Sequence, residues 1–138
     1  MNWKRLFWAG LAIYVVFQGL GLLMDNVFLK ADYDQLKAVW RQNMMSRMWI
    51  LYVVGLLVAF LFTYIFVKGR EGKGIQEGVR FGIIVWLFTI VPFDLETWVI
   101  FPIPHALVVK WLLFGLLTSL IGGIMAAMIY KPLAAPKA

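Results

Sequence analysis

Four long stretches of almost uninterrupted apolar residues set the main constraint on this chain. They cover residues 6–24, 48–67, 75–98 and 105–130. A helix needs about 20 mostly apolar residues to cross the hydrocarbon core of a bilayer, and each stretch reaches about that length. The apolar residues do not alternate with a period of two, which disfavours a transmembrane β-barrel. The sequence therefore predicts an all-α polytopic membrane protein, with four transmembrane helices in a single domain over residues 1–138.

The overall composition agrees with a chain that lies in lipid. It is 63% hydrophobic and 14% charged, whereas soluble domains are about 25% charged. The first stretch has 19 apolar residues, which exceeds the roughly 7–15 of a secretory signal, and no A-x-A-like cleavage site follows it. We interpret it as a retained helix, with a cleaved signal peptide as the alternative.

Lysine and arginine are divided unevenly between the two sides of the predicted bundle. The side with both termini and the loop after residue 67 carries eight of them, and the other side carries five. Because cytoplasmic loops are enriched in these residues, we expect an integral protein of the inner membrane with both termini in the cytoplasm. The basic residues lie at helix ends, so we read the net charge of +6 as a topology signal. The expected partner is the lipid bilayer, and no nucleic acid.

The segment between the first two helices has a helical pattern of its own. Its apolar residues recur with a period near 3.6, and charged residues fill the positions between them; they are Leu29, Tyr33, Leu36, Val39, Trp40 and Met44. This pattern predicts an amphipathic helix over residues 29–45 that lies on the outer membrane surface. The alternative is a helix that docks a partner protein or covers a site.

Small residues recur every four positions in the last two helices. Membrane helices associate by close packing at such residues. The candidate packing positions are Gly74, Gly78 and Gly82 in the third helix and Gly115, Ser119 and Gly123 in the fourth. We expect them to pack within the chain. The alternative is that the stripe of the fourth helix joins copies of the chain, or binds a membrane protein partner.

Four polar residues are expected at similar depth in the outer leaflet. Pro102 is eight residues from both Asp94 and Lys110, so a hairpin folded at Pro102 would place these two side chains level with each other. The helical rise of about 1.5 Å per residue puts Glu96 and Gln18 near the same depth. The sequence thus predicts a polar cluster of Asp94, Glu96, Lys110 and Gln18.

The role of this cluster stays open at the level of sequence. It would form a buried ion pair that locks the hairpin, or a relay or ligand site open to the outside. In a third interpretation the acids are solvated and Lys110 extends to the surface. Pro92 either kinks the third helix or ends its regular part near Val91.

The sequence offers little for catalysis. It has no cysteine and a single histidine, His105, which excludes bis-histidine haem ligation and a typical zinc site. We expect no metal, no cofactor and no catalytic residue. Trp86 and Trp111 lie deeper than tryptophan usually does, and we expect each indole N–H to find a partner within the protein.

The second half of the chain carries a resemblance. The stretches YIFVKGREGKGIQEGVRFG, PIPHALVVKW and GGIMAAMIYKP resemble a family of small uncharacterised bacterial inner-membrane proteins with four helices. The resemblance implies that layout and no activity. The first functional hypothesis is a non-enzymatic accessory or stabilising subunit, or a small homo-oligomeric bundle. The alternative is a small ion or solute transporter or channel that uses the acid–lysine cluster. A lipid- or quinone-handling enzyme is the third.

Overall fold

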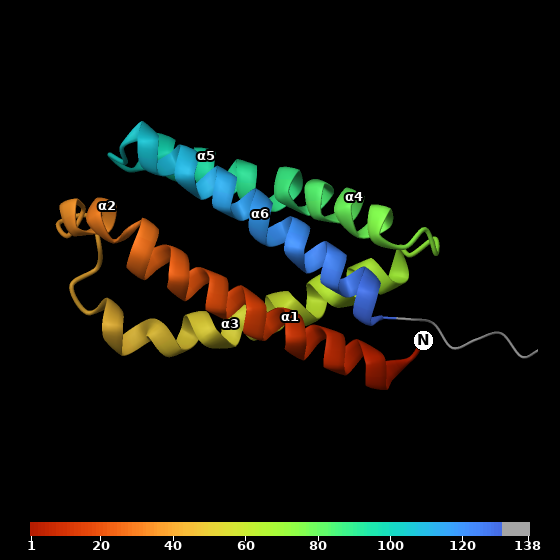
Figure 1. Cartoon of the computed structure of the whole chain (residues 1–138). Coiled ribbons are helices and arrows are strands. Elements are labelled where there is room, and N and C mark those ends of the chain that lie inside the picture. The colour runs from red at the N-terminus through yellow and green to blue at the C-terminus, as the bar shows by residue number, and fades with distance from the viewer. Residues whose placement is uncertain (131–138) are drawn as a thin grey trace, which may run out of the picture.

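The computed structural model describes residues 1–130, and all regular secondary structure within them is helical (Figure 1). Four helical segments are long and apolar enough to cross a membrane, namely Trp3–Phe28, Met44–Lys68, Ile75–Ile100 and His105–Ile129. They confirm the predicted all-helical fold with four candidate spans. The fourth predicted span, residues 105–130, lies within the described residues, and its helix ends at Ile129.

The first span is longer than its apolar stretch. Helix α1 (Trp3–Leu23) begins where the side-chain oxygen of Asn2 accepts the N–H of Arg5 at 3.2 Å, which satisfies one of the free amides of the first turn. It continues through a π-helical turn, η1 (Met24–Phe28), in which the N–H of Leu29 donates to the carbonyl of Met24 at 2.8 Å. Hydropathy did not predict this extension, because η1 contains the polar residues Asp25 and Asn26.

The third span passes through Pro92 without ending there. It consists of α4 (Ile75–Val85), the π-helical turn η3 (Trp86–Ile90) and α5 (Val91–Ile100). The N–H of Val91 donates to the carbonyl of Trp86, five residues earlier. A proline inside a regular helix clashes with the preceding turn and donates no hydrogen bond. The wider π turn just before Pro92 is a way to accommodate that ring while the chain remains helical.

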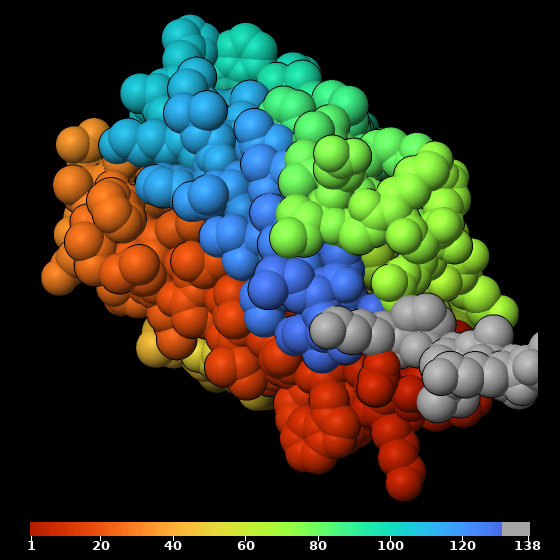
Figure 2. Space-filling view, turned by 45° about the vertical axis from the view of Figure 1, so that its right-hand side comes forward, coloured from red at the N-terminus to blue at the C-terminus, as the bar shows by residue number. Residues whose placement is uncertain are grey.

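Helix α1 contacts both α3 (Met48–Lys68) and α6 (His105–Ile129), while α4 lies along α6. Helix α3 crosses behind α1 and reaches α4, where the rings of Phe62 and Phe66 pack on Phe81 (Figure 1). In the space-filling view α6 forms a strip between α1 and the α4–α5 segment (Figure 2). Asn2, Tyr130 and the loop between α3 and α4 share one end of the molecule, which we call the termini end (Figure 1). Helix α2 (Lys30–Gln35) and the α5–α6 loop share the other end, the α2 end.

Helices α4 and α6 approach each other at small residues. A Cβ added to Gly78 would overlap the carbonyl oxygen of Gly123, and one added to Gly82 would lie 2.5 Å from the carbonyl oxygen of Ser119. Gly115 accommodates the side chain of Ile90, whose Cγ2 would lie 2.6 Å from an added Cβ. Five of the six candidate packing positions therefore lie at close approaches within the chain.

Gly74 does not pack in this way. A Cβ on it would meet no atom within 4 Å, and its φ of 71° is in the left-handed region. This residue precedes the first turn of α4, so its contribution is to backbone conformation. The prediction that it packs against another helix is wrong because the helix begins one residue later than the repeat of glycines suggests.

The predicted helix over residues 29–45 is also wrong in its extent. Only Lys30–Gln35 is α-helical, and turns follow until the 3-10 turn η2 (Met44–Arg47). An uninterrupted helix of this length would extend about 25 Å away from the end of α1, whereas the chain has to return to α3. The apolar residues of the segment pack instead on α6 and its preceding loop, in a buried cluster of Leu29, Leu36, Ile103, Leu107 and Val108.

Candidate functional site

The lysine of the predicted cluster has a different partner. Lys110 Nζ lies 2.6 Å from Asp32 Oδ2 on α2, in an ion pair that is partly buried. We expected Asp94 or Glu96 to bind this lysine. Because the segment after α1 folds back onto α6, the Asp32 carboxylate lies beside Lys110, in place of the acids of α5.

The other predicted members of the cluster separate. Gln18 lies against α3, since a Cβ on Gly55 would overlap its side-chain nitrogen. Glu96 is exposed, whereas Asp94, two residues earlier on α5, is buried with 7% of its surface exposed. The prediction of one four-residue cluster is therefore wrong, because equal depth does not make residues face the same way.

Asp94 lines a cavity of about 520 Å³ at the α2 end. Residues of α1, η1, α2 and the turns after it, η3, α5 and α6 line it. Its polar and aromatic lining residues include Asp25, Tyr33, Trp40, Asp94, Trp111 and Thr118. Both π turns reach it, η1 through Asp25 and η3 through Ile90. Turns of this kind occur frequently at functional sites.

The Asp94 carboxyl group is incompletely satisfied. Its Oδ2 is buried and has no hydrogen-bond partner among residues 1–130. A buried carboxyl oxygen without a partner is costly, and an ionisable group within a membrane span is more so. The Asp94 carboxyl group could therefore interact with a positive charge carried by a ligand in the cavity that this residue lines.

Tyr33 organises the aromatic side of the cavity. Its hydroxyl accepts the indole N–H of Trp111 at 2.9 Å and donates to Asp25 Oδ1 at 3.4 Å. Its backbone carbonyl accepts the indole N–H of Trp40 at 3.4 Å, and the two rings meet edge to face with centroids 5.6 Å apart. This network ties α2 to both η1 and α6.

The phenol of Tyr33 remains neutral and able to donate near neutral pH. Burial raises the pKa of Tyr33 to about 12, and the nearby negative charges of Asp25 and Asp32 act in the same direction. The hydrogen bond from Trp111 opposes them by stabilising the phenolate. Burial prevails because it disfavours the charged form most strongly.

The deep tryptophans satisfy their indole groups as predicted. Trp86 Nε1 donates to the carbonyl of Leu112 at 2.9 Å, and Trp111 Nε1 donates to Tyr33. These bonds hold α6 to η3 on one side and to α2 on the other. The sequence identified Trp111 as unusual in depth but did not connect it with a pocket.

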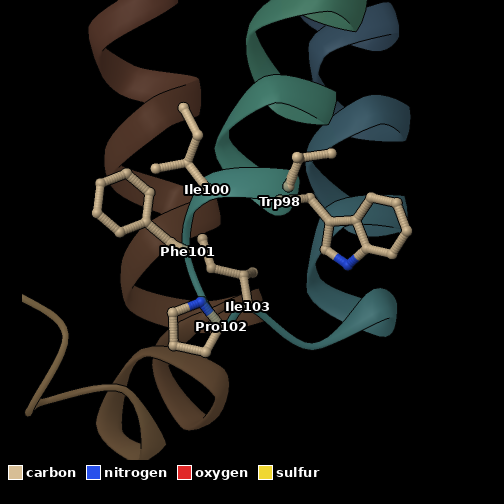
Figure 3. A pocket seen from close by; sticks show the side chains of 6 residues that line it. Trp98, Ile100, Phe101, Pro102 and Ile103 are labelled. Atoms are coloured by element: carbon tan, nitrogen blue, oxygen red, sulfur yellow. The ribbon is translucent and has the colours of Figure 1, made fainter.

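A second hollow at the α2 end offers no comparable chemistry. It has a volume of about 510 Å³ and is lined by the consecutive residues Trp98 to Ile103, which form the end of α5 and the start of the α5–α6 loop. Figure 3 shows Ile100 and Phe101 on one side of this loop and Trp98 on the other. None of these side chains is ionisable. The exposed His105 packs edge to face on Trp98, with ring centroids 5.0 Å apart.

The termini end holds a polar network that the sequence did not reveal. Buried Glu77 accepts the backbone N–H groups of Glu71, Gly72 and Lys73 with its two carboxylate oxygens. Glu71 pairs with Lys73 and, at 3.1 Å, with Arg80, and these hydrogen bonds and charges lower the pKa of Glu71. The Glu77 carboxylate thus holds the backbone of the α3–α4 loop, and it has a structural role.

Asp25, Tyr33, Trp40 and Trp111 are the lining residues that sequence reasoning did not place in a site. The signal for two of them was the apolar period between the first helices, which includes Tyr33 and Trp40. Within residues 1–130, no group of three His, Cys, Asp or Glu side chains could hold a metal ion. No protein-family model, no curated protein and no solved structure matches this chain.

Proposed function

We propose that this protein is a non-enzymatic solute-binding protein of the bacterial inner membrane, and that the pocket at the α2 end provides the binding step of a small transporter. The observation that supports this proposal most is the Asp94 oxygen, which is buried and unpartnered beside a cavity of about 520 Å³. Ligand pockets generally have this size and combine apolar walls with a few polar groups.

In this proposal the pocket opens toward the outer face of the membrane. Among residues 1–130 the termini end carries six Lys and Arg residues and the α2 end carries five. The sequence adds Lys131 and Lys137, which lie outside the described residues. Basic residues favour the cytoplasmic side. Both termini then lie in the cytoplasm. Asp94 is six residues from the end of α5 at Ile100, so it lies roughly 9 Å below that end. Such a depth suits a site that a solute enters from outside.

An accessory subunit or homo-oligomer is the second candidate. Its strongest motivation was the stripe of small residues on the fourth helix. In the structure Ser119 and Gly123 are buried against Gly82 and Gly78 of the same chain, so they do not offer a free surface. The first half of α3 does offer one, with Trp49, Leu51 and other apolar side chains exposed. Native mass spectrometry of gently extracted protein tests this candidate by revealing a defined complex.

Cysteine accessibility tests the pocket directly, because the natural chain contains no cysteine. Thr118 lines the cavity, whereas its neighbour Leu117 is exposed on the outer surface of the same helix, where lipid would cover it. A charged thiol reagent that does not cross membranes is added to the outside of right-side-out vesicles. We expect Thr118→Cys to react and Leu117→Cys to stay unmodified. Equal protection of both positions would contradict an open solute site.

A further inference from the structure

We infer that the pocket at the α2 end is selective for organic cations, in which a positively charged group is attached to an aromatic or branched apolar body. This inference rests on the proposed function of the pocket as a solute site and names the class of solute. It follows from the charge of the lining, from its aromatic residues and from its size.

The charge of the lining is one-sided. Asp25 and Asp94 are its two acids, and none of its residues is Lys, Arg or His. Lys110 lies nearby in the chain but is held by Asp32 at 2.6 Å. An anion in the cavity would meet two carboxyl groups without a compensating protein cation. A neutral solute would leave the two carboxyl groups without a compensating charge, whereas a cation supplies one.

The aromatic lining favours an organic cation over a small inorganic one. Trp40 and Trp111 use their indole N–H groups in bonds to Tyr33, so they offer the cavity ring surface and no free donor. Aromatic ring faces attract cations within about 6 Å, and sites for quaternary ammonium ligands use them widely. A metal ion would need several oxygen ligands, whereas residues 1–130 contain no group of three His, Cys, Asp or Glu side chains that could hold one.

The size of the cavity fits the same class. Its volume of about 520 Å³ lies in the range of roughly 300–1,000 Å³ that is usual for sites of drug-sized ligands. Apart from Thr97 and Thr118, the remaining walls are apolar, with Met24, Leu29, Ile90, Phe93 and Phe114 among them. They would bury the body of the ligand while the carboxyl groups bind its charge.

The test uses three probes of similar shape and different charge: tetraphenylphosphonium, neutral triphenylphosphine oxide and anionic tetraphenylborate. Binding to the full chain in nanodiscs is measured by equilibrium dialysis, and nanodiscs without protein give the lipid background. We expect saturable binding of the phosphonium alone. Asp94→Asn should weaken it by at least about tenfold, as loss of one partner of a buried charge pair does.

Glu96→Gln is the matched control, because Glu96 lies on the same helix and is exposed. It should bind the phosphonium as the natural protein does. Circular dichroism melting shows whether each variant folds. If Asp94→Asn does not fold, Asp25→Asn tests the second carboxyl group of the lining. Phosphonium binding that neither Asp94→Asn nor Asp25→Asn weakens would overturn the inference.

The outcomes separate this inference from the proposed function. Saturable binding of the borate or the phosphine oxide instead of the phosphonium overturns the preference for cations and leaves the solute site in place. If no probe binds while Thr118→Cys still reacts from outside, the preference for cations is also overturned and the solute site again remains in place. If no probe binds and Thr118→Cys is protected, both the inference and the proposed function fail.

Discussion

Lys110 Nζ lies 2.6 Å from Asp32 Oδ2, which joins two residues 78 positions apart in the sequence. The pair connects the short helix α2 to the first turns of α6, two segments that the buried cluster around Leu36 and Leu107 also joins. Because it is partly shielded from solvent, it should contribute more to holding α2 than a fully exposed pair would.

We therefore expect Asp32→Asn to loosen α2 while the four long helices stay folded. Amide hydrogen exchange, read by mass spectrometry, should become faster over residues 30–40 and remain unchanged in α1 and α6. Asp34→Asn is the control, since Asp34 pairs with Lys37 at 3.6 Å in an exposed local contact. Equal exchange in the Asp32 variant and the natural protein would show that the apolar contacts alone hold α2.

Tyr33 predicts how stability depends on pH in the alkaline range. Burial raises the pKa of Tyr33 to about 12 from its ordinary value of 10.0. Between these two values the unfolded chain loses the phenolic proton while the folded chain keeps it. Ionisation then favours the unfolded state, so the free energy of unfolding should fall as the pH rises from about 10 to 12. Below that range both states keep the proton, so Tyr33 should make stability neither rise nor fall with pH.

The measurement is a series of unfolding titrations in mixed detergent micelles across that pH range. Tyr33→Phe should show a smaller loss of stability with rising pH than the natural protein. Its tyrosinate absorbance should also lack one component that titrates near pH 12. Identical pH profiles for the two proteins would argue that the Tyr33 hydroxyl is open to water.

The close approach of α4 and α6 predicts a large effect for a small change. In Gly78→Ala the new Cβ would overlap the carbonyl oxygen of Gly123, and neither backbone can move without separating the two helices. We expect a loss of about 1–3 kcal/mol or more in the free energy of unfolding, as for other overpacked positions.

Gly19→Ala serves as the matched control for that change. Gly19 is also helical, but a Cβ on it would meet no atom within 4 Å. Replacing a helical glycine by alanine is usually stabilising by roughly 0.5–1 kcal/mol. Thermal unfolding of both variants in the same detergent measures the difference. If Gly78→Ala is tolerated as well as Gly19→Ala, the two helices are not in backbone contact.

Glu77 predicts the order of the α3–α4 loop. Its carboxylate accepts three successive backbone N–H groups, from Glu71 to Lys73. In Glu77→Ala these amides lose their acceptor, which should cost about 1–3 kcal/mol if they stay shielded from water. Trypsin should then cleave faster after Arg70 and Lys73. Gln76→Ala, at the exposed neighbouring position, should leave the cleavage rate unchanged.

The sequence by itself determined the helical spans and the positions where two of them approach closely. Hydropathy predicts the length of each span, because it is a local property of the sequence and the thickness of the bilayer sets the length required. Gly78 and Gly123 could be proposed as packing residues because the period of a helix places residues four apart on one face. The indole N–H of Trp111 needed a partner for an equally local reason, the cost of burying an unpaired donor.

Only the tertiary structure decided which polar groups meet. Helical rise gives the depth of Asp94, Lys110 and Gln18, but their direction depends on how each helix is rotated about its axis. That rotation results from many weak contacts between helices, and the π turn at residues 86–90 shifts it further on α5. It left Asp94 facing a cavity and Gln18 facing α3. The fold of the segment after α1 also decided that Lys110 pairs with Asp32. Burying Leu36 on α6 brings that segment back across the bundle and places Asp32 beside Lys110.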